Sequence, residues 1–150
     1  MALNEIDARG ERFQILATGA TAANSGVGPN SGDPLILGLA HSPSASLAVV
    51  CLTNYTPPGS LPATGYVSVS AVGIYALSVA AKTSINPGNG VAINPGDLVY
   101  ADGGMLDTTD GLLYGFTLNA NSTTGWKFGR AMDAITSGQT ATIRVRIGGN

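Results

Sequence analysis

The last alternating segment of the chain is the feature that most constrains its fold. Residues 140–147 place Ala141, Ile143, Val145 and Ile147 on one side, with threonine and arginine side chains on the other. Strict alternation of apolar and polar residues is typical of a β-strand that buries one face. We therefore expect a strand here, in a fold whose other strands cover that apolar face.

Turn-forming residues recur at short intervals along the rest of the chain. Glycine, proline, asparagine and aspartate cluster at residues 28–34, 57–59, 86–90, 94–97 and 102–104. This spacing is typical of a β-sandwich or β-barrel. Between the turns we expect strands at residues 11–17, 35–40, 47–52, 66–70, 74–79, 97–101 and 113–118. Residues 130–136 are expected to supply one short helical turn.

Two segments are expected to extend from this single β domain of residues 11–150. Residues 1–10 show no strand pattern and are interpreted as an N-terminal arm, loose in the isolated chain. Residues 41–65 are interpreted as an inserted loop rich in proline and serine on both sides of one apolar run. Proline lacks a backbone N–H, so this loop is expected to contribute no interior strand.

Charged residues are scarce, and this bears on what the surface contacts. They make up 11% of the chain, against roughly 25% in an average soluble protein. Neutral polar groups cost less to bury than ions, which favours surfaces covered by neighbouring molecules. Neutral loops in a glycine-rich sheet protein explain the composition equally well. The net charge of -2 and the scattered basic residues predict no nucleic-acid partner.

The chain offers little for catalysis or cofactors. His41 is the only histidine and Cys51 the only cysteine, so neither a histidine-based triad nor a zinc site is expected, and Cys51 is predicted to be a buried, inert thiol. Residues 76–83 lack both glycines of a phosphate-binding loop. Asp102, Asp107 and Asp110 lie close enough in sequence for calcium, but turn formation is the commoner use. We expect no catalytic residue, cofactor or metal.

Membrane association is not expected either. The first ten residues lack the basic start and apolar stretch of a secretion signal, and no segment approaches the ~18 apolar residues of a membrane span. The protein is therefore expected to be made and kept in the cytoplasm, at least initially.

Four segments, taken in order, resemble one known family. They are residues 31–38, 69–77 and 94–102, and residues 128–134 followed by 138–147. A Gly-Asp pair before an apolar strand occurs in the first and third segments, and an arginine-containing strand closes the last. Together they resemble the tailed-phage capsid decoration proteins, also called cement or head-stabilising proteins, whose members are often labelled recombinase-like. The resemblance spans residues 11–148 and is interrupted by longer stretches at 23–30, 41–65 and 119–126.

The resemblance implies a β-tulip-like barrel or sandwich that binds the outer surface of the major capsid protein lattice and stabilises the expanded head. It also implies a place on the virion surface and self-association, with a trimer favoured over a dimer. A small binding module, such as a receptor- or carbohydrate-binding domain of a tail fibre, is the alternative, and it would need exposed aromatic residues.

The candidate partner-binding residues lie in the arm and on the predicted surface. The arm is expected to pair with an exposed strand edge of the partner. Trp126 anchors an interface or caps the core, and Arg144 and Arg146 either meet an acidic surface or face solvent. The full set is Leu3, Asn4, Glu5, Ile6, Tyr55, Trp126, Arg144 and Arg146.

Overall fold

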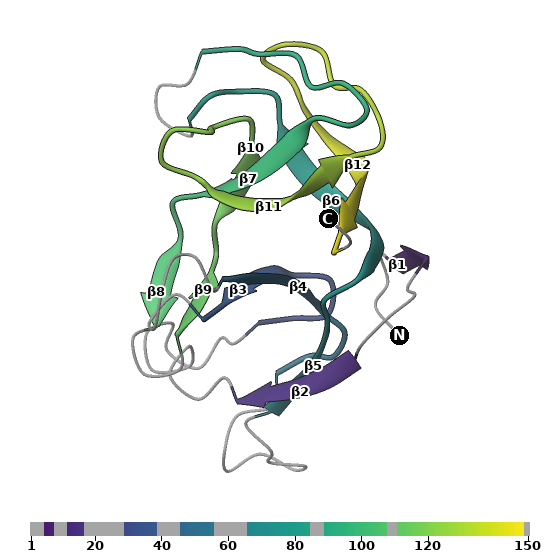
Figure 1. The fold of residues 1–150 in the computed structure, drawn as a ribbon, viewed down its shortest axis with the longest axis vertical. Helices are drawn as coiled ribbons and strands as arrows, with labels where there is room; N and C mark the ends of the chain where they lie inside the picture. The colour runs from purple at the N-terminus through teal and green to yellow at the C-terminus, as the bar shows by residue number, and fades with distance from the viewer. Residues whose placement is uncertain are drawn as a thin grey trace.

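The regular structure of the protein is all β, as the sequence predicts. The computed structural model describes residues 5–7, 12–16, 29–38, 46–55, 66–84, 89–107 and 111–148. Within these ranges twelve strands form two six-stranded sheets and there is no helix. One sheet closes into a barrel and the other lies open beneath it, so that the two stack along the long axis of the molecule (Figure 1).

Five strands close the barrel. Its hydrogen-bonded order is β6, β10, β7, β11 and β12, and β12 pairs back onto β6. The β6–β12 ladder is the longest contact, with antiparallel pairs running from Thr140↔Ala80 to Ile147↔Gly73. The bounds of these strands are β6 Gly73–Ala80, β7 Leu98–Asp102, β10 Thr117–Asn119, β11 Trp126–Ala131 and β12 Thr140–Ile147.

The alternating pattern of the last strand is confirmed. In β12 the side chains of Ile143, Val145 and Ile147 are buried while Arg144 and Arg146 are exposed. The opposing strand β6 buries Tyr75, Leu77 and Val79 in the same way, as its sequence predicts. These residues fill the barrel, so its interior is a packed core.

The second sheet is open and antiparallel, in the order β2, β5, β4, β3, β9, β8. Its strands are β2 Arg12–Leu16, β3 Pro34–Leu37, β4 Leu47–Cys51, β5 Tyr66–Ser70, β8 Met105–Asp107 and β9 Leu112–Tyr114. The strand β4 lies between β3 and β5, so the expectation that residues 41–65 contribute no interior strand is wrong. All prolines of that segment lie outside β4 and do not interrupt its ladder.

Both faces of this open sheet are buried at its centre. Ile36 and Val50 belong to the barrel core, whereas their neighbours Leu35 and Val49 belong to a second cluster on the opposite face. A strand covered on both faces needs no alternation, which explains the continuous apolar run of β4. Cys51 is part of the second cluster, as the sequence predicts for a buried thiol.

The expected strand at 113–118 is divided between the two sheets. Gly115 has a φ of 66°, a left-handed conformation that interrupts strand geometry. Residues before it form β9 of the open sheet, and residues after it form β10 of the barrel. The helical turn expected at 130–136 is likewise wrong, because β11 continues to Ala131 and Ile135 forms an isolated bridge with Ile93.

Two turns with the same chemistry start one strand in each sheet. The Gly-Asp pairs expected to make these turns follow Asn30 and Asn94. The carboxylates of Asp33 and Asp97 each accept a hydrogen bond of 2.8 Å from the backbone N–H of that asparagine. The glycine in each turn has a φ near 95°, at 97° for Gly32 and 95° for Gly96. These turns lead into β3 and β7.

The N-terminal arm contributes one short strand that its sequence does not predict. Residues Glu5–Asp7 form β1, which pairs with β6 at Tyr75 and Ile74 with a shift of register between the two pairs. The candidate residues Leu3 and Asn4 lie outside the described part of the chain.

Candidate binding groove

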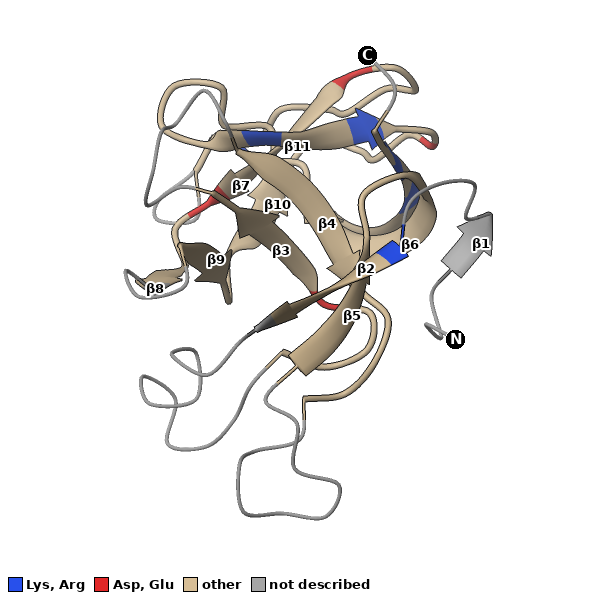
Figure 2. Ribbon diagram, turned by 60° about the horizontal axis from the view of Figure 1, so that its bottom comes forward, with Lys and Arg blue, Asp and Glu red and all other residues tan. Residues whose placement is uncertain are grey.

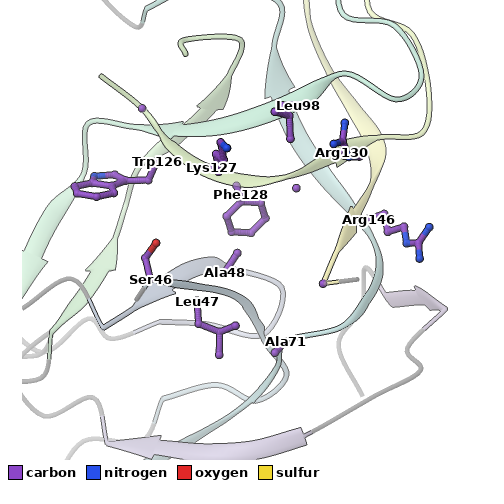
Figure 3. A pocket seen from close by; sticks show the side chains of 13 residues that line it. Ser46, Leu47, Ala48, Ala71, Leu98, Trp126, Lys127, Phe128, Arg130 and Arg146 are labelled. Atoms are coloured by element: carbon purple, nitrogen blue, oxygen red, sulfur yellow. The ribbon is translucent and has the colours of Figure 1, made fainter. Parts of the chain in front are cut away.

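A groove runs between the barrel and the open sheet. It has a volume of about 810 Å³, with β11 on the barrel side and β4 on the sheet side (Figure 3). Its lining is Ser46, Leu47, Ala48, Ala71, Leu98, Gly125, Trp126, Lys127, Phe128, Gly129, Arg130, Arg146 and Gly148. The volume falls within the range of ligand sites, roughly 300–1,000 Å³.

The groove has an apolar centre. Phe128 is buried and lies against Phe116, with ring centroids 5.8 Å apart. Trp126 is partly buried and packs against the barrel core, which agrees with its expected role as a cap and still leaves part of the indole accessible. On the opposite wall the small side chain of Ala48 points toward Phe128, whereas the side chain of Leu47 points away from β11, on the other face of β4 (Figure 3). A partner's apolar side chain would therefore meet Phe128, Ala48 and Trp126.

Positive charge gathers at the groove. Three of its lining residues, Lys127, Arg130 and Arg146, are cationic and exposed, and none is acidic. Figure 2 shows basic segments along β11 and no acidic one on that strand. The guanidinium of Arg130 donates a hydrogen bond of 2.9 Å to the backbone carbonyl of Gly96, which fixes its position. Within the described ranges, no carboxylate forms an ion pair with Lys127 or Arg146.

Two strands beside the groove are paired on one side only over part of their length. Leu47–Val49 of β4 pair with β3, whereas β5 reaches only Val50 and Cys51. On the barrel side, β12 reaches only Arg130 and Ala131 of β11, so 126–129 have just β7 as a neighbour among the described strands. The N-terminal halves of β4 and β11 thus present backbone edges.

A buried polar network holds the loop that leads to Trp126. The Asn119 side chain donates a hydrogen bond of 3.0 Å to the Asp102 carboxylate. Its carbonyl oxygen accepts one of 2.8 Å from the backbone N–H of Asn121. The Asn121 amide in turn donates to the Thr124 hydroxyl at 2.8 Å. These hydrogen bonds tie the loop to β7 and β10. Asp102, Asn119 and Asn121, which make them, are all buried.

Arg144 and Arg146 lie on the same strand face but have different surroundings. Arg144 binds Asp133, whose carboxylate accepts hydrogen bonds from the guanidinium Nε at 3.1 Å and from the Arg144 backbone N–H at 2.9 Å. These hydrogen bonds lower the pKa of Asp133 from 3.8 to about 2 and raise the pKa of Arg144. Only Arg146 of this pair lines the groove, together with Trp126.

Tyr55 is not a surface residue. Its side chain is only 9% exposed and packs in the second hydrophobic cluster. The expectation that Tyr55 reaches a partner is therefore wrong, because its position near the proline-rich segment did not indicate that it folds back onto the sheet. Glu5 and Ile6 lie in β1.

The described residues offer no assembled catalytic or metal centre. No group of three or more His, Cys, Asp or Glu side chains lies together within them. Asp102 is a strand residue held by Asn119 and not the turn former expected from sequence, while Asp110 and His41 lie outside the described ranges. No helix in the described part of the chain is long and apolar enough to cross a membrane.

Several groove residues were missed by the sequence analysis. Lys127 and Arg130 lie in residues 126–130, a run noted for its tryptophan and for the family-like segment that begins at Phe128, but not for its cations. A register shift between Lys127 and Gly129 disturbs strand alternation, so the two cations could not be assigned to a face.

Comparison of the chain with family models, with curated proteins and with solved structures gave no match. The protein is a small all-β protein with a closed five-stranded barrel stacked on an open sheet, and a cationic groove between them.

Proposed function

We propose that this chain is a capsid decoration protein of a tailed phage. It binds the outer surface of the major capsid protein lattice, stabilises the expanded head and resides on the virion surface. It self-associates there, as a trimer in preference to a dimer, and repeated contacts on a lattice then add avidity.

The observation that carries the proposal is where the four family-like segments lie. The first and third form the two equivalent Asn-x-Gly-Asp turns and the strands β3 and β7 that follow them. The second spans the passage from β5 to β6, and the last supplies β11 and β12. The segments therefore supply all or part of four of the five barrel strands, β6, β7, β11 and β12, and the strand β3 of the open sheet.

The N-terminal strand also supports the proposal. Among the described residues, β1 pairs with the body at Glu5↔Tyr75 and Asp7↔Ile74, with a register shift between the two pairs. Such a short edge strand is easily released, and it could pair instead with a strand edge of the capsid lattice.

The alternative, a glycan-binding tail-fibre module, has less support. It needs aromatic rings in the open, but Tyr55, Tyr75 and Tyr114 are buried and Trp126 is partly covered. Among the described aromatic residues only Tyr66 counts as exposed, at 48%. Likewise, the groove lining holds no carboxylate, histidine or cysteine for acid–base or nucleophilic chemistry.

The test is co-sedimentation of the purified protein with expanded capsids that lack it. We expect saturable binding in a fixed ratio to the major capsid protein, and weaker binding when residues 1–10 are deleted. Analytical ultracentrifugation of the free protein measures its oligomeric state in parallel. Failure to pellet with any expanded cognate capsid would overturn the decoration function.

A further inference from the structure

The groove between β4 and β11 combines three properties that a docking site for a protein segment requires. It has apolar side chains at Phe128, Ala48 and Trp126, cations at Lys127 and Arg146, and strand edges that no described strand pairs with. We propose that it receives an extended, acidic segment of a protein partner, which adds to one of these edges as a β-strand. With the proposed function, the partner is the capsid lattice.

The location of the unpaired edges supports an extended segment. Each edge begins where a neighbouring strand ends, at the end of β5 for β4 and at the end of β12 for β11. The residues that follow those ends, Ala71 and Gly148, both line the groove. The two edges therefore adjoin the groove, where an added strand would continue a ladder that the described strands leave incomplete.

The junction of those two strand ends closes the groove at one side. A Cβ atom on Gly148 would lie 2.6 Å from the carbonyl oxygen of Ala71 and 2.7 Å from the Val72 side chain. The backbone after β12 thus rests directly on the corner between β5 and β6. This close contact fixes the position of the barrel relative to the open sheet at this point. The distance between the two walls of the groove therefore depends on how the barrel stacks on the sheet.

Charge indicates the chemistry of the segment. The whole chain carries seven basic and nine acidic residues, and the described lining of the groove holds three basic residues and no acidic one. Arg130 is bound to the Gly96 carbonyl, whereas Lys127 and Arg146 form no ion pair with a described carboxylate, so we assign these two cations to the partner. Carboxylates on alternate residues of an added strand would face these cations while the intervening residues meet Phe128 and Trp126.

Strand edges favour a polypeptide over a glycan as the occupant. Backbone N–H and C=O groups in a row match another strand, whereas a sugar would gain most from an open aromatic face. Here the indole of Trp126 is partly covered by the barrel core. Binding of an anionic oligosaccharide instead of a peptide would be a different result, and the experiment below detects it.

The experiment uses the full chain and three fluorescent probes, so it does not depend on capsids. The probes are a peptide of alternating Glu and Val, a peptide of alternating Lys and Val, and tetragalacturonate. We expect the acidic peptide to bind, measured by fluorescence anisotropy, and the basic peptide not to bind. Hydrogen exchange should slow at Leu47–Val49 or at 126–129 when the acidic peptide is present.

Charge variants link binding to the groove. K127E/R146E should weaken binding of the acidic peptide at least tenfold and should allow the basic peptide to bind. The matched control K82E reverses a charge just beyond the far end of β6 and should change the affinity less than twofold. K127A/R146A, which introduces no repulsion, should give an intermediate loss, and circular dichroism checks that each variant is folded.

Three outcomes would overturn the docking inference. They are equal affinity of wild type and K127E/R146E for the acidic peptide, no binding of that peptide at all, and binding of tetragalacturonate alone. None of them bears on capsid co-sedimentation, so this inference and the decoration function can fail separately. If capsids bind wild type and K127E/R146E equally, the function stands and the groove is not its contact.

Discussion

The ion pair between Arg144 and Asp133 ties β12 to the segment that precedes it. Asp133 accepts hydrogen bonds from both the side chain and the backbone of Arg144, and the backbone N–H of Met132 donates to the Arg144 carbonyl at 2.8 Å. Because the pair is at the surface, salt screens it and its contribution to stability is small. Its contribution to the free energy of unfolding can be measured from the dependence of stability on pH.

We predict that the pair contributes to stability only above the pH at which Asp133 is protonated. The pKa of Asp133 is lowered from 3.8 to about 2 in the folded state. The contribution is therefore complete above about pH 4 and is lost as the pH falls towards 2. Asp133→Asn should lower the free energy of unfolding slightly at pH 7, and the difference from wild type should vanish near pH 2 in urea titrations. A difference that persists at pH 2 would contradict the assignment.

Cys51 gives a second prediction at the scale of one residue. Burial raises the pKa of this thiol from 9.0 to about 11, and its S–H donates to the Thr53 carbonyl at 3.0 Å. Only the thiolate reacts with Ellman's reagent, so the native protein should show almost no reaction at pH 8, and one thiol should react after unfolding. Fast labelling under native conditions would show that the second cluster opens readily.

At the scale of elements, the barrel depends on the polar network as well as on apolar packing. Asn119 is fully buried at the end of β10 and links Asp102 of β7 to the backbone of Asn121. The loop that this link orders leads directly into Trp126 and β11. Loss of the link should therefore affect both stability and the groove.

We predict that Asn119→Ala lowers the free energy of unfolding by roughly 1–3 kcal/mol, because it leaves the buried Asp102 carboxylate without its amide donor. The same change should loosen the loop and increase the fluorescence quenching of Trp126 by acrylamide. Ser122→Ala, at an exposed position of that loop, serves as the control and should leave both measurements unchanged. Unchanged quenching in Asn119→Ala would mean that other contacts order the loop.

At the scale of the whole molecule, the barrel and the open sheet share a core. Ile36 of β3 packs into the barrel cluster, while the adjacent Leu35 packs into the cluster on the other face of the sheet. Both side chains are fully buried. One strand thus carries residues of two cores, and neither core can be lost without disturbing the other.

This sharing predicts a single cooperative unfolding transition. Ile36→Ala and Leu35→Ala should each destabilise by roughly 2–5 kcal/mol and should shift the same transition in calorimetry and denaturant titrations. Near-ultraviolet circular dichroism and Trp126 fluorescence should report equal midpoints in both variants. Separate midpoints, with Leu35→Ala affecting only one of them, would show that the barrel unfolds independently of the sheet.

Local sequence was sufficient for the class of fold and for many of its strands. The alternation of residues 140–147, the Asn-x-Gly-Asp turns and the buried Cys51 follow from side-chain period, turn chemistry and hydrophobicity, which act between near neighbours.

Only tertiary structure decided that β4 lies inside a sheet, that Gly115 divides one apolar run between two sheets, and that Tyr55 is buried. It also placed Arg146 and Trp126 in the lining of the same groove, and it paired Arg144 with Asp133 in an ion pair. These outcomes depend on which strands pair and how the barrel stacks on the sheet, and pairing between distant segments is not encoded in the pattern of either segment alone.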